Sequence, residues 1–148
     1  MNKLYLIALF TFVAACRPVS DDENQQLVST YFFIRHAEKD LTDPENKNPD
    51  LTPQGYERAQ KWSKIFSEVS FDAVYATDFI RTVETAKPTA IAQNLEIQYY
   101  EPGSIDYGQF LNNTRGQTLL VVGHSNSTPK FVNEILGMEI YEEIDESV

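Results

Sequence analysis

The chain has 148 residues, enough for one domain with a substantial hydrophobic core. Its composition, 42% hydrophobic and 23% charged, is that of an ordinary globular protein. The net charge of −10 disfavours nonspecific binding to nucleic acid, because the protein and the phosphate backbone repel each other. The single cysteine, Cys16, excludes an intrachain disulfide and a cysteine-based metal cluster.

The first residues have the features of a targeting segment. A basic start at Lys3 precedes an almost unbroken apolar run from Leu4 to Ala15, which is short for a transmembrane helix. The run ends in Val13-Ala14-Ala15-Cys16, which resembles a bacterial lipobox, where small residues precede a cysteine that is lipidated and becomes the new N-terminus. The alternative is an ordinary secretory signal. We expect a signal peptide over residues 1–15, a lipid anchor at Cys16 and a flexible polar tether over residues 16–28.

The resemblance to a lipoprotein also indicates a location. An aspartate directly after the lipidated cysteine is associated with retention in the inner membrane, and here Arg17 occupies that position. We therefore expect a protein of the bacterial cell envelope that is anchored to the outer membrane, on its periplasmic or surface face.

The folded part is expected over residues 29–148 and begins with a buried strand. Tyr31 to Ile34 is an apolar run that ends in Arg35 and His36, a pattern typical of a central strand in a parallel sheet. The polar loop over residues 40–50 follows and is expected to border a site. Thr52 as N-cap and Pro53 at the first helical position then predict a helix over about 53–67. Its inward face is expected to contain Tyr56, Ala59, Trp62, Ile65 and Phe66.

The rest of the chain continues to alternate between strand and helix patterns. Strands are predicted over 71–76, 95–100 and 117–122. Between them we expect a helix that Thr77 or Asp78 caps and that Pro88 kinks or splits, and a short helix that ends near Asn113. A last helix containing Phe131 follows Gly123 and His124. This alternation predicts an α/β fold, a three-layer α/β/α sandwich with a largely parallel sheet.

Polar side chains follow two of the predicted buried strands. His36 and His124, the only histidines of the chain, come directly after these strands, and the carboxyl ends of parallel strands open on one edge of a sheet. Arg35 and, on the first turn of the second helix, Arg81 add positive charge near the same edge. Two arginines, two histidines and helix N-termini suit a doubly negative group, such as a phosphoryl group. No histidine and carboxylate cluster has metal-ligand spacing, so neither a metal nor another cofactor is expected.

Four motifs in this order resemble the histidine phosphatase superfamily, also called phosphoglycerate mutase-like. They are Arg35-His36-Ala37-Glu38, Leu51-Thr52-Pro53-Gln54-Gly55, the run from Ala76 to Ala86, and Gly123-His124-Ser125. The resemblance spans about residues 30–137, and the short chain is similar to the small phosphohistidine phosphatases of that family. It implies a phosphoglycerate mutase-like fold.

The resemblance also implies roles for the site residues. His36 would be the nucleophile that carries a phosphohistidine, and Arg35, Arg81 and His124 would bind the phosphoryl oxygens. Glu101 is the preferred general acid, with Asp106 as the alternative. If neither residue is the general acid, the enzyme would act on substrates with good leaving groups, such as phosphohistidine or phosphoanhydrides. Glu84 is expected to orient Arg81, and Glu38 and Lys39 either line the mouth of the site or are solvated.

The resemblance implies a metal-independent phosphatase acting on a phosphomonoester, phosphoramidate or phosphoanhydride. The alternatives are phosphoryl transfer of the phosphoglycerate mutase type and a catalytically inactive envelope lipoprotein that binds phosphorylated ligands. The expected partners are a small phosphorylated substrate or a phosphoprotein and, through Cys16, a membrane. Relatives usually continue into another strand after the final acidic segment, so a truncated chain or a missing edge strand is expected.

Overall fold

The computed structural model describes residues 27–146, so the predicted signal segment and Cys16 lie outside the described residues. None of the helices in the described range has the length and apolar character needed to cross a bilayer. Strands and helices alternate in the order β1 (Thr30–Arg35), α1 (Pro53–Ile65), β2 (Ala73–Ala76), α2 (Ile80–Ala92), β3 (Ile97–Tyr99), α3 (Tyr107–Asn113), β4 (Thr118–Gly123) and α4 (Ser127–Leu136).

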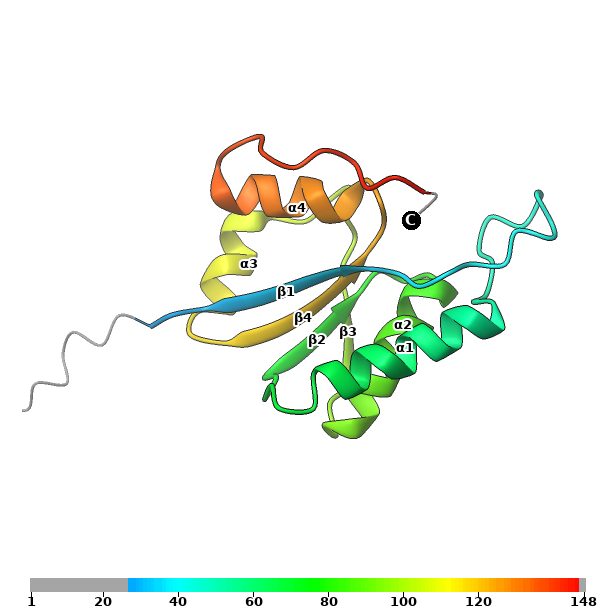
Figure 1. Ribbon diagram of the computed structural model, residues 1–148. Coiled ribbons are helices and arrows are strands. Elements are labelled where there is room, and N and C mark those ends of the chain that lie inside the picture. The colour runs from blue at the N-terminus through cyan, green and yellow to red at the C-terminus, as the bar shows by residue number, and fades with distance from the viewer. Residues whose placement is uncertain (1–26, 147–148) are drawn as a thin grey trace, which may run out of the picture.

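The sheet is parallel throughout and has the strand order β1-β4-β2-β3. Helices α1 and α2 cover one face and α3 and α4 the other, which confirms the predicted three-layer α/β/α sandwich (Figure 1). The register aligns Arg35 of β1 with Gly123 of β4. His36 and His124 therefore leave the sheet side by side, and the backbone N–H of His36 donates to the Gly123 carbonyl over 3.0 Å.

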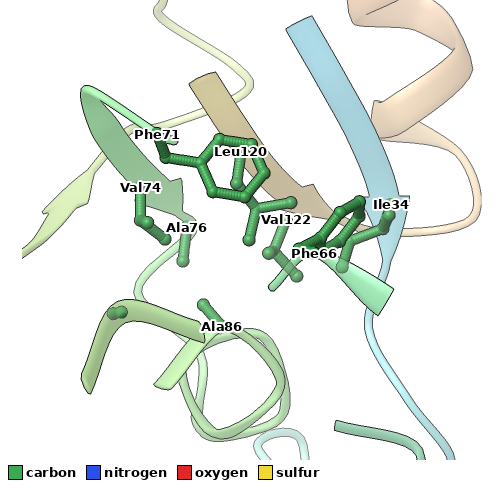
Figure 2. Packing of buried hydrophobic residues seen from close by; sticks show 9 residues of the cluster. Ile34, Phe66, Phe71, Val74, Ala76, Ala86, Leu120 and Val122 are labelled. Carbon is green, nitrogen blue, oxygen red and sulfur yellow. The ribbon is translucent and has the colours of Figure 1, made fainter. Parts of the chain in front are cut away.

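The core has two halves, one on each face of the sheet. Alternate residues of a strand point to opposite faces, so Leu120 and Val122 of β4 face α1 and α2, whereas Leu119 and Val121 face α3 and α4. Figure 2 shows the first half, in which residues of three strands pack against the end of α1 and against Ala86 of α2. All four β4 side chains are fully buried, so β4 is the rigid centre on which the site is built.

Helix α1 confirms its predicted start but not its whole predicted inward face. The hydroxyl of Thr52 accepts the backbone N–H of Gly55 over 3.0 Å, as an N-cap does. Ala59 is fully buried, but Tyr56 and Ile65 are 39% and 54% exposed, so their predicted burial is wrong. Gly55 and Ala59 are the buried residues of α1, which packs against α2, and Tyr56 and Ile65 lie outside this buried face.

Helix α2 differs from the prediction at its start and in its middle. Phe79 holds the N-cap position and makes no side-chain cap bond, so the predicted cap by Thr77 or Asp78 is wrong. The hydroxyl of Thr77 is instead hydrogen-bonded to side chains inside the protein. Pro88 does not split the helix, which runs from Ile80 to Ala92, because the burial of Ala86 and other residues against the core holds both halves in one piece.

The chain turns back after α4 and runs toward the carboxyl end of β1 (Figure 1). Gly137 ends the helix in the left-handed conformation, with φ of 64°. The buried Asn133 then fixes the returning segment, since its Oδ1 accepts the N–H groups of Ile140 and Tyr141 and its Nδ2 donates to the Tyr141 carbonyl. Residues 137–146 form no strand, and within the described part of the chain β1 and β3 are the edges of the sheet.

Candidate active site

His36 lies in the turn that follows β1 and is 5% exposed. Its Nδ1 lies 2.8 Å from the carbonyl oxygen of Ala37. A carbonyl only accepts, so Nδ1 carries the proton and Nε2 keeps a free lone pair. Burial, reinforced by the charges of Arg81, Arg35 and Lys39, lowers the pKa of His36 to about 4, although the Ala37 bond opposes the shift. The ring is therefore neutral at pH 7 and has one nucleophilic nitrogen.

The turn that carries His36 is fixed from two sides. Its Ala37 N–H donates to Thr85 Oγ1 over 2.9 Å, and that hydroxyl donates to the Arg81 carbonyl over 2.6 Å, so the turn is attached to α2. On the other side, the Thr52 N–H donates to the Glu38 carbonyl, and Gly55 packs so closely on that carbonyl that a Cβ would overlap it. The threonine of one motif and the glycine of another therefore position His36.

Arg81 on the first turn of α2 supplies unused hydrogen-bond donors to the site. Its guanidinium lies over the ring of Phe79, with Cζ 4.5 Å from the ring centre, and its Nη2 is 3.4 Å from His124 Nδ1. Its Nε and Nη1 are buried and have no hydrogen-bond partner among residues 27–146. Buried donors are rarely left unpaired, and these two can bind an anion in the cleft.

His124 follows β4, and its ring centre lies 5.5 Å from that of His36. Its Nε2 is 2.9 Å from Thr77 Oγ1, on the side away from Arg81. Burial and then the charges of Arg81, His36 and Lys39 lower the pKa of His124 to about 4, whereas Glu146 raises it. Both histidines are therefore neutral at pH 7.

These side chains open on a cavity of about 560 Å³. The first residues of α4 also line it, so the positive end of a helix dipole faces the cavity. Glu101 lies on the rim and accepts the Gly103 N–H over 3.3 Å. Asp106 does not line this cavity, because its carboxylate caps α3 by accepting the Gln109 N–H. Of the two acids proposed from the sequence, only Glu101 borders the histidines.

A carboxylate that the sequence reasoning missed lies at the mouth of the cavity. Glu146 contacts Arg35 Nη2 at 3.2 Å and Lys39 Nζ at 2.9 Å, and it accepts a hydrogen bond from the Ser125 hydroxyl. The hydrogen bonds from Lys39 and Ser125, with the charge of Arg35, lower the pKa of Glu146 to about 2. Only the acidic composition of residues 142–146 could have suggested this contact, and composition does not say where a segment folds back.

Four side chains near the cleft have partners that the sequence did not predict. Glu84 pairs with Lys87 and not with Arg81, so the expected orientation of Arg81 by Glu84 is wrong, because Arg81 points inward and Glu84 outward. Glu38 pairs with Arg58, and Lys39 with Glu146. Asn48 of the 40–50 loop accepts the N–H of Ile80 at the start of α2.

No group of three or more His, Cys, Asp or Glu side chains in residues 27–146 is arranged to hold a metal ion.

Comparison with known proteins agrees with this geometry. Residues 31–102 match the sequence model of the histidine phosphatase superfamily, branch 1. A search of curated protein sequences gave no significant match. The matched range contains His36, Arg35 and Arg81 but not His124, which the parallel pairing of β1 and β4 brings beside His36.

Several solved structures share the fold. A phosphoserine phosphatase variant from Entamoeba histolytica, in complex with phosphoserine, superposes with a TM-score of 0.61 at 15% identity, over 76% of this chain and 82% of that chain. The protein histidine phosphatase SixA complexed with tungstate gives 0.58 at 19% identity, over 70% and 74%. The α-ribazole phosphatase from Shigella flexneri gives 0.57 at 18% identity, over 73% and 80%.

The sequence match and the shared fold give one assignment. The matched range supplies the turn after β1 with its arginine and histidine, and α2 with its arginine. The parallel sheet then places a second histidine opposite the first. Residues 31–102 therefore resemble branch 1 of the histidine phosphatase superfamily in sequence, and the described domain shares the fold of solved phosphatases at low identity.

Proposed function

We propose that the protein is a phosphatase that works through a phosphohistidine on His36. The observation that carries this proposal is the single free nitrogen of a buried, neutral His36, placed beside the unpaired donors of Arg81. Nε2 attacks phosphorus while the bond to the leaving oxygen or nitrogen breaks. Water then attacks the phosphohistidine, the phosphorus–nitrogen bond breaks, and inorganic phosphate and free His36 result.

Phosphoryl transfer needs mainly positioning and charge stabilisation. Arg81 and the start of α4 line the cavity with positive charge, the charge of Arg35 acts on His36 from the end of β1, and His124 adds a ring nitrogen on the side opposite His36. These groups fit the equatorial oxygens of a phosphoryl group. The overall acidity of the chain does not oppose this, since the positive groups are concentrated at the cavity.

The leaving group takes its proton from Glu101 in this proposal, because Glu101 is the acid on the rim beside the histidines. Its exposed position suits a donor that reaches the substrate only when the substrate is bound. Glu101→Gln should slow the hydrolysis of an alkyl phosphate much more than that of p-nitrophenyl phosphate, whose leaving group needs no proton. Asp106→Asn is the matched control and should affect both substrates equally. Equal loss on both substrates in Glu101→Gln would exclude Glu101 as the acid and favour phosphoramidates or phosphoanhydrides as substrates.

The main test uses the full-length chain and p-nitrophenyl phosphate in the presence of EDTA. We expect turnover that vanadate inhibits, and acid-labile phosphate on the protein after rapid quenching. His36→Ala should lose activity by on the order of a thousandfold or more and form no phosphoenzyme. His124→Ala is the matched control, since it removes the other histidine. It should be slower by on the order of a hundredfold and still form the phosphoenzyme.

Each alternative gives a different result in this experiment. Phosphoenzyme on His36→Ala would overturn the nucleophile assignment. Tight phosphate binding without turnover in the wild type would favour the non-catalytic binding protein. Transfer of phosphate between the hydroxyls of a phosphoglycerate would favour the mutase.

The lipid anchor at Cys16 remains part of the proposal, on the strength of the lipobox-like sequence alone. An envelope location would put the enzyme among phosphorylated compounds outside the cytoplasm. Cys16→Ser should move the protein from the membrane fraction to the soluble fraction. Continued membrane retention of this variant would contradict the anchor.

A further inference from the structure

Two buried threonines form a hydrogen-bonded chain behind His124. Thr77 directly follows β2, Thr82 lies in the first turn of α2, and they are 1% and 0% exposed. Thr77 Oγ1 lies 2.9 Å from His124 Nε2 and 3.0 Å from Thr82 Oγ1. Thr82 Oγ1 also lies 2.8 Å from the carbonyl oxygens of Thr77 and Phe79.

The donor and the acceptor in each of these hydrogen bonds follow from the number of protons available. Thr82 has one hydroxyl proton, and its two carbonyl neighbours can only accept, so Thr82 donates to them. Thr77 must then be the donor to Thr82, which uses its only proton. His124 Nε2 must therefore donate to Thr77, so the proton of the neutral ring is on Nε2. The lone pair of the ring is on Nδ1, on the side of Arg81.

We propose that Thr77 and Thr82 are positioning residues that fix the His124 ring with Nε2–H held inward and Nδ1 turned to the phosphoryl group. In the empty site the lone pair of Nδ1 faces the Arg81 Nη2 donor at 3.4 Å. When a bound dianion takes that donor, the lone pair faces an anionic oxygen instead, which is repulsive, so binding requires a second proton on Nδ1. Anion binding is thereby coupled to the uptake of one proton by His124, which then donates a hydrogen bond to the phosphoryl oxygen. The catalytic meaning of this arrangement rests on the proposed function, but the ring orientation and the proton uptake do not.

The charges around His124 are consistent with a proton that is absent from the empty site and present in the complex. Arg81 from α2, and His36 and Lys39 from the segment after β1, face the ring and disfavour its cationic form. Glu146 from the C-terminal segment favours that form. A phosphoryl dianion adds negative charge to the same cavity and shifts the balance toward the protonated ring.

The decisive measurement is NMR of ring nitrogens in the full-length chain labelled with ¹⁵N-histidine. The chain has two histidines, so His36→Ala assigns both rings. We expect wild-type His124 as the Nε2–H tautomer and His36 as the Nδ1–H tautomer at pH 7. Saturation with inorganic phosphate should protonate Nδ1 of His124. A His124 that carries its proton on Nδ1 in the free protein, or that stays neutral with phosphate bound, would overturn the inference, and neither result depends on a threonine variant.

Variants then test the threonines themselves. Thr77→Val should lose the single Nε2–H tautomer, lower kcat on p-nitrophenyl phosphate about tenfold and shift its pH profile, because a mispositioned donor commonly costs this much. Thr77→Ser should restore both the tautomer and kcat. Thr89→Val is the control, because Thr89 is a buried threonine of α2 whose hydroxyl has no partner among the described residues. It should behave as the wild type.

The positioning role of the threonines and the proposed phosphatase activity can each be contradicted without the other. A wild-type tautomer and pH profile in Thr77→Val, with activity present, would overturn the positioning role and leave the phosphatase intact. The expected spectra in a protein without turnover would support the positioning role and contradict the proposed function.

Discussion

The hydroxyl of Thr85 joins the turn that carries His36 to α2, and its removal should weaken both folding and catalysis. Thr85 is fully buried and accepts the Ala37 N–H over 2.9 Å. Thr85→Val keeps the size and branching of the side chain but leaves that buried N–H without an acceptor. An orphaned buried donor costs about 1–3 kcal/mol, so the free energy of unfolding should fall by about 2 kcal/mol. The freed turn holds His36 less firmly, so we expect kcat to fall about tenfold.

Urea unfolding followed by the fluorescence of Trp62, the single tryptophan, measures the first effect. Turnover of p-nitrophenyl phosphate measures the second. Thr85→Ser keeps the hydroxyl and should recover most of both losses. Thr89→Val makes the same replacement where the hydroxyl has no partner among the described residues, and it should stay within ~0.5 kcal/mol of the wild type. A fall in the free energy of unfolding of less than ~0.5 kcal/mol in Thr85→Val, or no more than in Thr89→Val, would refute this role of the Thr85 hydroxyl.

Three further predictions concern pH, the acidic segment and a glycine. Burial lowers the pKa of His36 from 6.5 to about 4. The stability contributed by the neutral ring is therefore fully present above pH 6.5 and is lost as the pH falls through about 4. The urea midpoint should fall across that pH range, and it should fall less in His36→Asn. Glu146→Gln should tighten phosphate binding up to about fivefold by calorimetry, since a half-exposed ion pair is worth at most ~1 kcal/mol. Gly55→Ala should lower the free energy of unfolding by about 2 kcal/mol, because its Cβ would overlap the Glu38 carbonyl.

Each of these predictions has a control. His36→Asn with the same pH dependence as the wild type would show that other groups cause the loss. Glu142→Gln removes an exposed charge of the same segment and should leave phosphate affinity unchanged, so equal gains in both variants would mean a general charge effect. Gly103→Ala, whose Cβ would have only one neighbour, at 3.7 Å, should not alter stability, and an equal loss there would contradict the steric argument.

The sequence predicted the order of the elements and the placing of His36, Arg81 and His124 near one edge of the sheet, because both follow from strong local patterns. Apolar runs marked β1 and β4, and a parallel sheet places His36 and His124 on the same edge, whereas the direct pairing of β1 with β4 came from the structure. The start of α1 was also predictable, since Thr52 and Pro53 act on neighbouring backbone groups. Such features need no knowledge of long-range contacts.

The features that were missed depend on competition between distant groups. A threonine before a helix usually caps it, but Thr77 binds His124 instead, 47 positions away. Glu84 was assigned to Arg81 from helical spacing, yet Lys87 lies at an equivalent spacing on the solvent side. The contact of Glu146 with Arg35 requires the chain to reverse after α4, which the sequence pattern does not specify. Side-chain partners of this kind are decided by tertiary packing.

The anchoring of the C-terminal segment by Asn133 determines how strongly Glu146 competes for the cleft. Three hydrogen bonds hold the chain at Ile140 and Tyr141, and the carboxylate follows five residues after Tyr141. A group on so short a tether has an effective concentration on the order of millimolar, although its own contact is weak. Under the proposed function, a phosphorylated ligand at micromolar concentration would have to displace this carboxylate. Ligands that make additional contacts beyond the phosphoryl group would then be favoured over free phosphate.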